Sequence, residues 1–212
     1  MDKDTYDLIR AMPPNAPDDA CDLTDLDNDN IPWERVPKIK ELMQGNDNYV
    51  ALQAAMLLAH WGVDEGFDYL ESFACDRPPL TENWMPHRLR SYDDTYKHIL
   101  DAFVGYWARQ ATDSDMQGIL ARARIQRPIN RIIQLAGTMP FGIEYFFWLV
   151  ERKGFTEYLP ALKEHLVAIL KHPELHHWKI ADCARLLMKF DPAFVEQALA
   201  THGKTLADFP EK

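Results

Sequence analysis

A helical unit that occurs twice constrains the fold of this chain more than any other feature. The first copy is YVALQAAMLLAHWG (49–62) followed by DEGFDYLESF, and the second is WKIADCARLLMKF (178–190) followed by DPAFVEQALATHG. A shift of 129 positions aligns one apolar helix face, pairing Tyr49 with Trp178, Ala55 with Ala184, Leu57 with Leu186, Leu58 with Leu187, and Trp61 with Phe190. A turn and a second helix follow in both. Such self-similarity predicts stacked helical hairpins, which form binding surfaces more often than catalytic pockets.

Helical patterns follow one another along the rest of the chain, and no segment has the features of a strand. In 92–109 the apolar residues recur at the spacing of one buried helical stripe. We expect helices over 115–125 and 128–136 that are separated before Pro128, because a residue preceding proline avoids helical dihedrals. We expect a central helix, buried on most sides, over 142–153. The sequence predicts an all-α protein of roughly nine or ten helices in antiparallel pairs.

The length and composition are those of a globular protein. A chain of 212 residues can bury roughly 70% of the surface that its unfolded form exposes, so we expect a single domain, 1–212. No apolar run reaches the length of about 18 residues that spans a bilayer, and the N-terminus lacks the pattern of a secretory signal. Three cysteines without CxxC spacing favour reduced thiols. We therefore expect a cytoplasmic protein that has no membrane partner.

The charge of the chain is unevenly distributed. Residues 1–30 carry nine acidic and two basic side chains, a net −7, whereas the other 182 residues account for only −3 of the total of −10. We expect 12–32, which is rich in Pro and Asp, to be an acidic loop lying over the body of the protein. Its aspartates are Asp18, Asp19, Asp22, Asp25, Asp27 and Asp29. An acidic balance disfavours a protein that grips nucleic-acid phosphates, and it favours basic partners or plain solvation of the loop.

Four arginines stand in a stretch, 116–143, that contains no acidic residue between them: Arg122, Arg124, Arg127 and Arg131. On a helix, Arg124 and Arg131 can share a face with Arg127, which predicts a modest basic patch. Two interpretations remain open. The arginines either bind the acidic loop and fasten it over the helices, or they contact a partner.

Catalytic patterns are missing from the sequence. It has no GxSxG, no Walker-type glycine loop, no HExxH and no dinucleotide fingerprint, so we predict no catalytic residue and no cofactor. The densest set of metal-ligating side chains is KHPELHHWK, with His172, His176 and His177. We expect Pro173 to place these histidines on a loop between two helices, where their spacing matches no familiar zinc site. We therefore assign no metal.

The two copies resemble HEAT-type repeats, which are paired helices with a small residue facing the neighbouring helix, a Leu-Leu step, and Gly or Asp-Pro between the helices. The similarity covers about 26 residues of each copy, and the segment 88–113 does not follow the repeat. The resemblance implies a compact, irregular, α-solenoid-like stack of antiparallel helix pairs.

This chain is small and acidic and ends with LLMKFDP…GKTLADF. In these features it also resembles bacterial toxin-immunity proteins. The resemblance implies a non-enzymatic protein that occludes the active site of a cognate toxin domain, which is often a basic nuclease. The six aspartates would then attract the toxin, and Trp33 and Trp84 would anchor it. Two alternatives remain: a scaffold or adaptor for a regulatory partner, and, less favoured, a nucleic-acid-acting helical-repeat enzyme like the alkylpurine DNA glycosylases.

Overall fold

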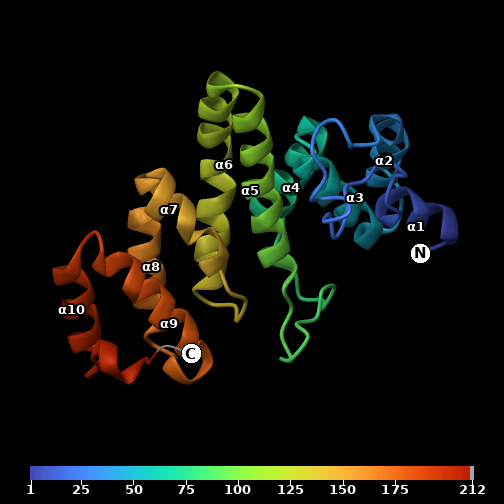
Figure 1. The fold of residues 1–212 in the computed structure, drawn as a ribbon. Coiled ribbons are helices and arrows are strands. Elements are labelled where there is room, and N and C mark those ends of the chain that lie inside the picture. Colours follow the sequence, from blue (N-terminus) through green and yellow to red (C-terminus); the bar gives the residue numbers. More distant parts are fainter. Residues whose placement is uncertain (211–212) are drawn as a thin grey trace. The chain divides into compact units, whose positions relative to one another are not determined.

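The computed structural model describes residues 1–210 and confirms the predicted all-α class (Figure 1). Over this range the chain forms no β-strand, and it shows one isolated β-bridge between Pro86 and Asp93. No helix in the described part is long and apolar enough to cross a bilayer. The helices are α1 (Lys3–Arg10), α2 (Val36–Met43), α3 (Asn48–His60), α4 (Asp64–Cys75), α5 (Thr95–Asp113), α6 (Asp115–Ala136), α7 (Phe147–Lys153), α8 (Leu159–Ile169), α9 (Pro173–Met188) and α10 (Pro192–Thr201).

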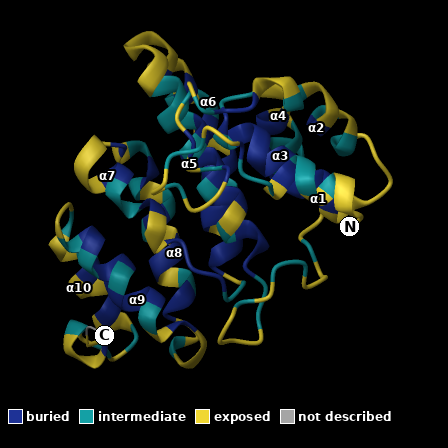
Figure 2. Cartoon of the chain, turned by 45° about the vertical axis from the view of Figure 1, so that its right-hand side comes forward, coloured by how far each residue is buried: buried dark blue, intermediate teal, exposed yellow. Residues whose placement is uncertain are grey.

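The helices belong to two compact units. Unit 1 consists of Met1–Pro78 and Asp101–Ile125, and unit 2 consists of the rest of the chain, so α5 and α6 each contribute residues to both. In unit 1, α3 packs against α2 and α4; in unit 2, α9 packs against α8 and α10. Figure 2 shows α3 as the most thoroughly buried of the unit 1 helices, in agreement with an unbroken buried run from Val50 to Ala59. Consecutive helices thus form the packed pairs.

Both copies of the repeated sequence fold as a helix, a turn and a second helix, α3 with α4 and α9 with α10. The aligned residues at the centre of each copy are buried: Ala55, Leu57 and Leu58 in α3, and Ala184, Leu186 and Leu187 in α9. The last aligned pair differs, because Trp61 is buried whereas Phe190 is 38% exposed. The helix pairs follow from the sequence, and their HEAT-type classification stays a prediction.

Three predicted helices, 115–125, 128–136 and 142–153, are wrong in their extent. The α6 helix continues through Pro128 without the expected break, because Ile125, Ile129 and the proline itself are buried and their packing outweighs the lost backbone hydrogen bond. The segment 142–153 is a 3₁₀ turn (Glu144–Phe146) followed by the short α7, and not one long helix. Phe146, Leu149 and Val150 are buried in this segment, whereas Tyr145 is 43% exposed.

The predicted histidine loop is also wrong, since it is the start of α9. Pro173 occupies the first turn of α9, where its missing N–H costs no hydrogen bond. His176 is buried at a kink in this helix, with φ of −121°. His172 and His177 stay exposed.

Unit 2 buries a cationic side chain beside two histidines. The Nζ of Lys179 donates to the carbonyls of Ala136 (2.8 Å) and Met139 (3.0 Å) at the C-terminal end of α6. Burial lowers the pKa of Lys179 to about 7. Burial, and then the charge of Lys179 and the neighbouring His176, lower the pKa of His165 to about 3. His165 is only 3% exposed, so it is neutral in the folded protein near pH 7.

The buried His165 should make the protein sensitive to acid. At pH 5 the unfolded chain protonates this histidine and the folded chain does not, so the unfolded state binds more protons and stability falls as the pH falls. From the unfolded value of 6.5 and the folded value of about 3, the expected loss between pH 7 and pH 5 is about 2 kcal/mol. Denaturant unfolding at both pH values measures this loss. His165→Leu should abolish that part of the pH dependence, and His98→Leu, at an exposed position of α5, should retain it.

Gly66 gives a second test, at the contact between α3 and α4. A Cβ added at Gly66 would lie 2.6 Å from Leu58 Cβ and 2.7 Å from the carbonyl oxygen of Ala55. We expect Gly66→Ala to lower the free energy of unfolding by about 1–3 kcal/mol in urea titrations, because α4 has no room for the methyl group. Helix propensity alone would raise it by up to about 1 kcal/mol, so an increase would contradict the observed packing.

Candidate functional site: the acidic face of unit 1

The two units differ in net charge. Unit 1 has 20 acidic and 9 basic residues, a net −11, whereas unit 2 has 13 acidic and 14 basic residues, a net +1. The whole net charge of −10 therefore belongs to unit 1. A surface with this bias attracts cationic partners and repels nucleic acid.

The acidic loop is anchored to unit 1 by its few apolar residues. Leu23, Leu26 and Ile31 are buried in the core cluster that includes Leu58 and Trp61. The indole Nε1 of Trp61 donates a buried hydrogen bond of 2.8 Å to the carbonyl of Leu23. The loop thus places three apolar side chains and one backbone carbonyl inside unit 1.

Arg109 on α5 also binds the same loop through hydrogen bonds. Its guanidinium donates to the carbonyl of Leu26, to Asn28 Oδ1 at 3.0 Å and to the carbonyl of His60 at 3.4 Å. Asn28 in turn donates to Asp113 Oδ1 at 2.8 Å. Burial lowers the pKa of Arg109, and the charges of Asp27 and Asp113 oppose that shift. One arginine therefore ties the loop to both α3 and α5.

All six aspartates of the loop are exposed. Two of them shape the loop, since Asp25 accepts from the N–H of Cys21 (3.0 Å) and Asp22 accepts from the N–H of Thr24 (2.7 Å). The other four have no side-chain hydrogen bond or ion pair to any described residue, and their carboxylates meet solvent: Asp18, Asp19, Asp27 and Asp29.

The two tryptophans proposed as anchors lie in different units. Trp33, 47% exposed, donates to the carbonyl of Asn28 (3.1 Å) and packs edge-on against Trp61, with ring centroids 6.4 Å apart. It therefore borders the acidic loop. Trp84 is half-buried on the connection between α4 and α5, in unit 2.

The four arginines all lie on α6, with Arg122 and Arg124 in unit 1 and the other two, Arg127 and Arg131, in unit 2. Arg124 forms ion pairs with Asp64 (2.6 Å) and Asp68 of α4 and lies over the ring of Phe67. These contacts bind α6 to α4 and do not reach the acidic loop. Arg109, which lies outside this group of four, does contact the acidic loop.

Arg124 and Asp64 also hold the phenol of Tyr106. Its hydroxyl donates to Asp64 at 2.6 Å, and burial together with this bond raises the pKa of Tyr106 to about 12. The bonds from Tyr106 and Arg124 lower the pKa of Asp64. This ion-pair network joins α4, α5 and α6 within unit 1.

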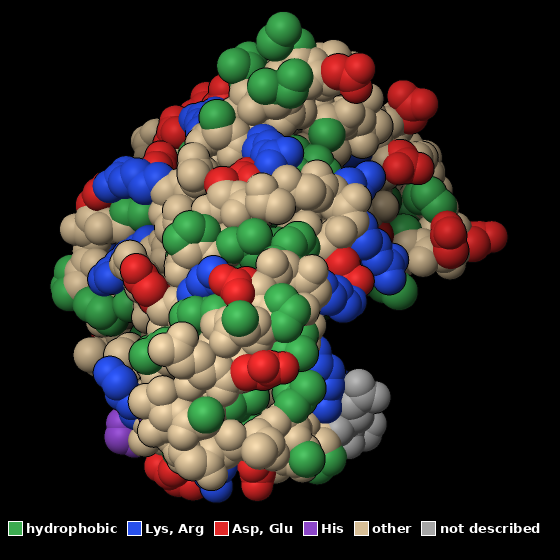
Figure 3. Space-filling view, turned by 90° about the vertical axis from the view of Figure 1, so that its left-hand side faces the viewer, with side chains coloured by type: hydrophobic (Ala, Val, Ile, Leu, Met, Phe, Trp, Pro, Cys, Tyr) green, Lys and Arg blue, Asp and Glu red, His purple; other side chains and the backbone are tan. Residues whose placement is uncertain are grey.

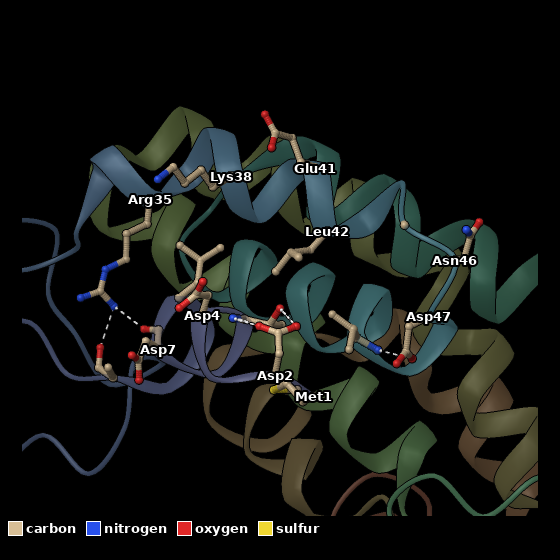
Figure 4. A pocket seen from close by; sticks show the side chains of 15 residues that line it. Met1, Asp2, Asp4, Asp7, Arg35, Lys38, Glu41, Leu42, Asn46 and Asp47 are labelled. Carbon is tan, nitrogen blue, oxygen red and sulfur yellow. Dashed lines mark hydrogen bonds between the residues drawn. The ribbon is translucent and has the colours of Figure 1, made fainter.

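A second acidic feature of unit 1 is a cavity of about 1100 Å³ between α1, α2 and the start of α3. Figure 4 shows Lys38 and Glu41 on the α2 side and Asp4 on the α1 side. Arg35, which is also part of the lining, donates to the carbonyl of Ala11 at 2.6 Å. The charged side chains of the lining are Asp2, Asp4, Asp7, Glu41 and Asp47, together with Arg35 and Lys38.

The described residues include no group of three or more His, Cys, Asp or Glu side chains arranged to hold a metal ion. Comparison of the chain with protein-family models, with curated proteins and with solved structures finds no match. The charge and geometry of unit 1 are therefore the observations that bear on function.

Arg109 offers a direct test of the docked loop. Arg109→Met removes all three hydrogen bonds of the guanidinium, and we expect cleavage within 18–29 by a protease that cuts before aspartate to accelerate about tenfold or more, since charged hydrogen bonds are the strong ones. Arg88→Met, which removes the same charge from an exposed position of unit 2, should leave the rate unchanged. Equal rates for the two variants would contradict this role of the Arg109 hydrogen bonds.

Proposed function

We propose that this chain binds a basic protein through the acidic face of unit 1, by which we mean the loop 12–32 with its six exposed aspartates. The chain neutralises that protein by covering its active site, as an immunity protein does with a toxin domain. One observation carries the proposal: the net charge of −11 in unit 1, with four solvent-facing carboxylates on a loop fixed to its surface. A patch of one sign attracts a partner of the other sign, raises the association rate and disfavours wrong partners. Its action is steric and electrostatic and needs no turnover.

The fixed position of the loop supports this reading over plain solvation. Exposed aspartates that only solvate a segment need no anchoring, whereas this loop buries Leu26 fully and gives its carbonyl to Arg109. A loop that is already ordered loses little conformational entropy when a partner binds. Its carboxylates are therefore presented in advance at fixed positions.

The alternatives differ in how well the same observations support them. A scaffold or adaptor would use the same acidic face, and would differ only in leaving its partner active. A nucleic-acid-acting enzyme is less supported, because the acidic charge of unit 1 repels phosphate and Arg124 is engaged by Asp64 and Asp68.

The proposal is tested by capture followed by a growth assay. The purified protein serves as bait in lysate of the native cell, and each protein recovered at stoichiometric amounts is expressed alone and together with this chain. We expect one basic protein that arrests growth alone and is silenced by co-expression. A captured partner whose activity persists in the complex would favour the adaptor reading, and recovery of nucleic acid would contradict both.

The four solvent-facing aspartates should set the affinity and its salt dependence. Asp18→Asn, Asp19→Asn, Asp27→Asn and Asp29→Asn together should weaken the complex about tenfold or more at low salt and flatten the dependence of its Kd on ionic strength. The matched control replaces four exposed glutamates of unit 2, Glu82, Glu164, Glu174 and Glu196, by Gln. This control makes the same change in total charge and should leave both quantities unchanged. Equal effects of the two sets would contradict a localised site.

A further inference from the structure

The first two turns of α6 leave large apolar side chains in solvent. Met116, Ile119 and Leu120 are 64%, 63% and 57% exposed. Their spacing of three and four residues puts them on one face of the helix, and we call this face the α6 stripe. Figure 3 shows hydrophobic side chains gathered at the end of the molecule where α5 turns into α6, with acidic side chains beside them. Grouped exposed apolar side chains with a polar border are typical of protein-binding surfaces.

The α6 stripe is held on a rigid support within unit 1. Gly118 lies so close to α5 that an added Cβ would be 3.0 Å from Ala111 Cα. The first turn of α6 is capped by Ser114, whose Oγ accepts from the N–H of Gln117 at 3.2 Å. The preceding residue, Asp113, accepts the hydrogen bond from Asn28 of the acidic loop. The stripe and the loop are therefore parts of one connected surface.

A groove of about 690 Å³ begins at the stripe. Leu120 forms part of its wall, and the rest of the lining includes Asp64, Glu65, Asp113 and the ion-paired Arg124. A partner that places an apolar side chain on the stripe would thus also meet the groove, which is lined by three carboxylates and one guanidinium. Apolar contacts in this setting suit a segment that alternates apolar with cationic side chains.

We infer that the α6 stripe is the apolar anchor of the interface, and that it takes an amphipathic segment of the basic partner with lysine or arginine flanking its apolar residues. The inference rests on the proposed function, because the partner's positive charge is taken from it. Carboxylates steer the encounter, and the desolvated apolar contact slows dissociation. A second copy of this chain is the poorer occupant, since two faces from units of −11 repel each other.

The test uses two synthetic probes with the full chain. One is an amphipathic helical peptide of leucine and lysine, and the other has the same lysines with serine in place of leucine. Fluorescence anisotropy gives the Kd of each, and methyl NMR of Met116, Ile119 and Leu120 locates the contact. The stripe variant carries Met116→Gln, Ile119→Gln and Leu120→Gln, which keep good helix formers at exposed positions. Its matched control carries Val167→Gln, Leu175→Gln and Phe190→Gln, three exposed apolar residues of unit 2.

We expect the leucine-lysine peptide to bind the wild-type chain more tightly than the serine-lysine peptide and to shift the α6 methyl signals. The stripe variant should weaken it about tenfold or more, to the level of the serine-lysine peptide, and the control should not. No binding, or a Kd that the stripe variant leaves unchanged, would overturn the inference. So would a wild-type dimer in sedimentation that the stripe variant dissociates.

The same probes separate this inference from the proposed function. If the four Asp→Asn substitutions weaken both peptides but the stripe variant weakens neither, the acidic face stands and the anchor fails. If the Asp→Asn substitutions leave the serine-lysine peptide unaffected, the electrostatic part of the proposed function fails, whatever the stripe does.

Discussion

The guanidinium of Arg109 is the contact on which the proposed binding face depends. It joins a carbonyl of the acidic loop, an amide of the same loop and the last turn of α3. Trp61 adds a second buried hydrogen bond to the loop, and Leu23, Leu26 and Ile31 fill the space between them. A segment dense in like charges resists compaction, so these few contacts have to hold against the repulsion among its aspartates. Without them the carboxylates would have no fixed place on unit 1.

Net charge distinguishes the two units from each other. Unit 1 tolerates a net charge of −11 because some of its carboxylates form ion pairs within the unit, as in the Arg124–Asp64 and Lys40–Glu65 pairs. Eleven of its acidic residues lie on the loop and around the α1–α2 cavity, where solvent and not the core surrounds them. Repulsion among these carboxylates lowers folding stability. It occurs in the same part of the chain that would attract a basic partner. Unit 2, with +1 and a buried lysine bound to helix carbonyls, has no comparable surface bias.

Much of the fold can be predicted from sequence, because helical periodicity and the repeated unit act locally. The α3–α4 and α9–α10 pairs and the acidic loop are of this kind. The helix break predicted before Pro128 is wrong, because packing in the folded chain outweighs the tendency of the residue before a proline to avoid helical dihedrals. Arg109 has no sequence signal, since a single arginine in a polar end of a helix resembles any solvated residue. Met116, Ile119 and Leu120 have the spacing of a buried face, so periodicity alone predicts burial where the structure leaves them exposed.

The proposed binding face exists only if the acidic loop is a fixed part of unit 1. Hydrogen exchange of the Trp61 indole N–H, followed by NMR, is the measurement to make, because that proton is bonded to the carbonyl of Leu23 in the docked loop. If the loop is docked, we expect slow exchange of this proton, comparable to that of the backbone amides of α3. Exchange as fast as that of a free indole would mean that the loop leaves the surface, and the binding face described for unit 1 would then not exist in solution.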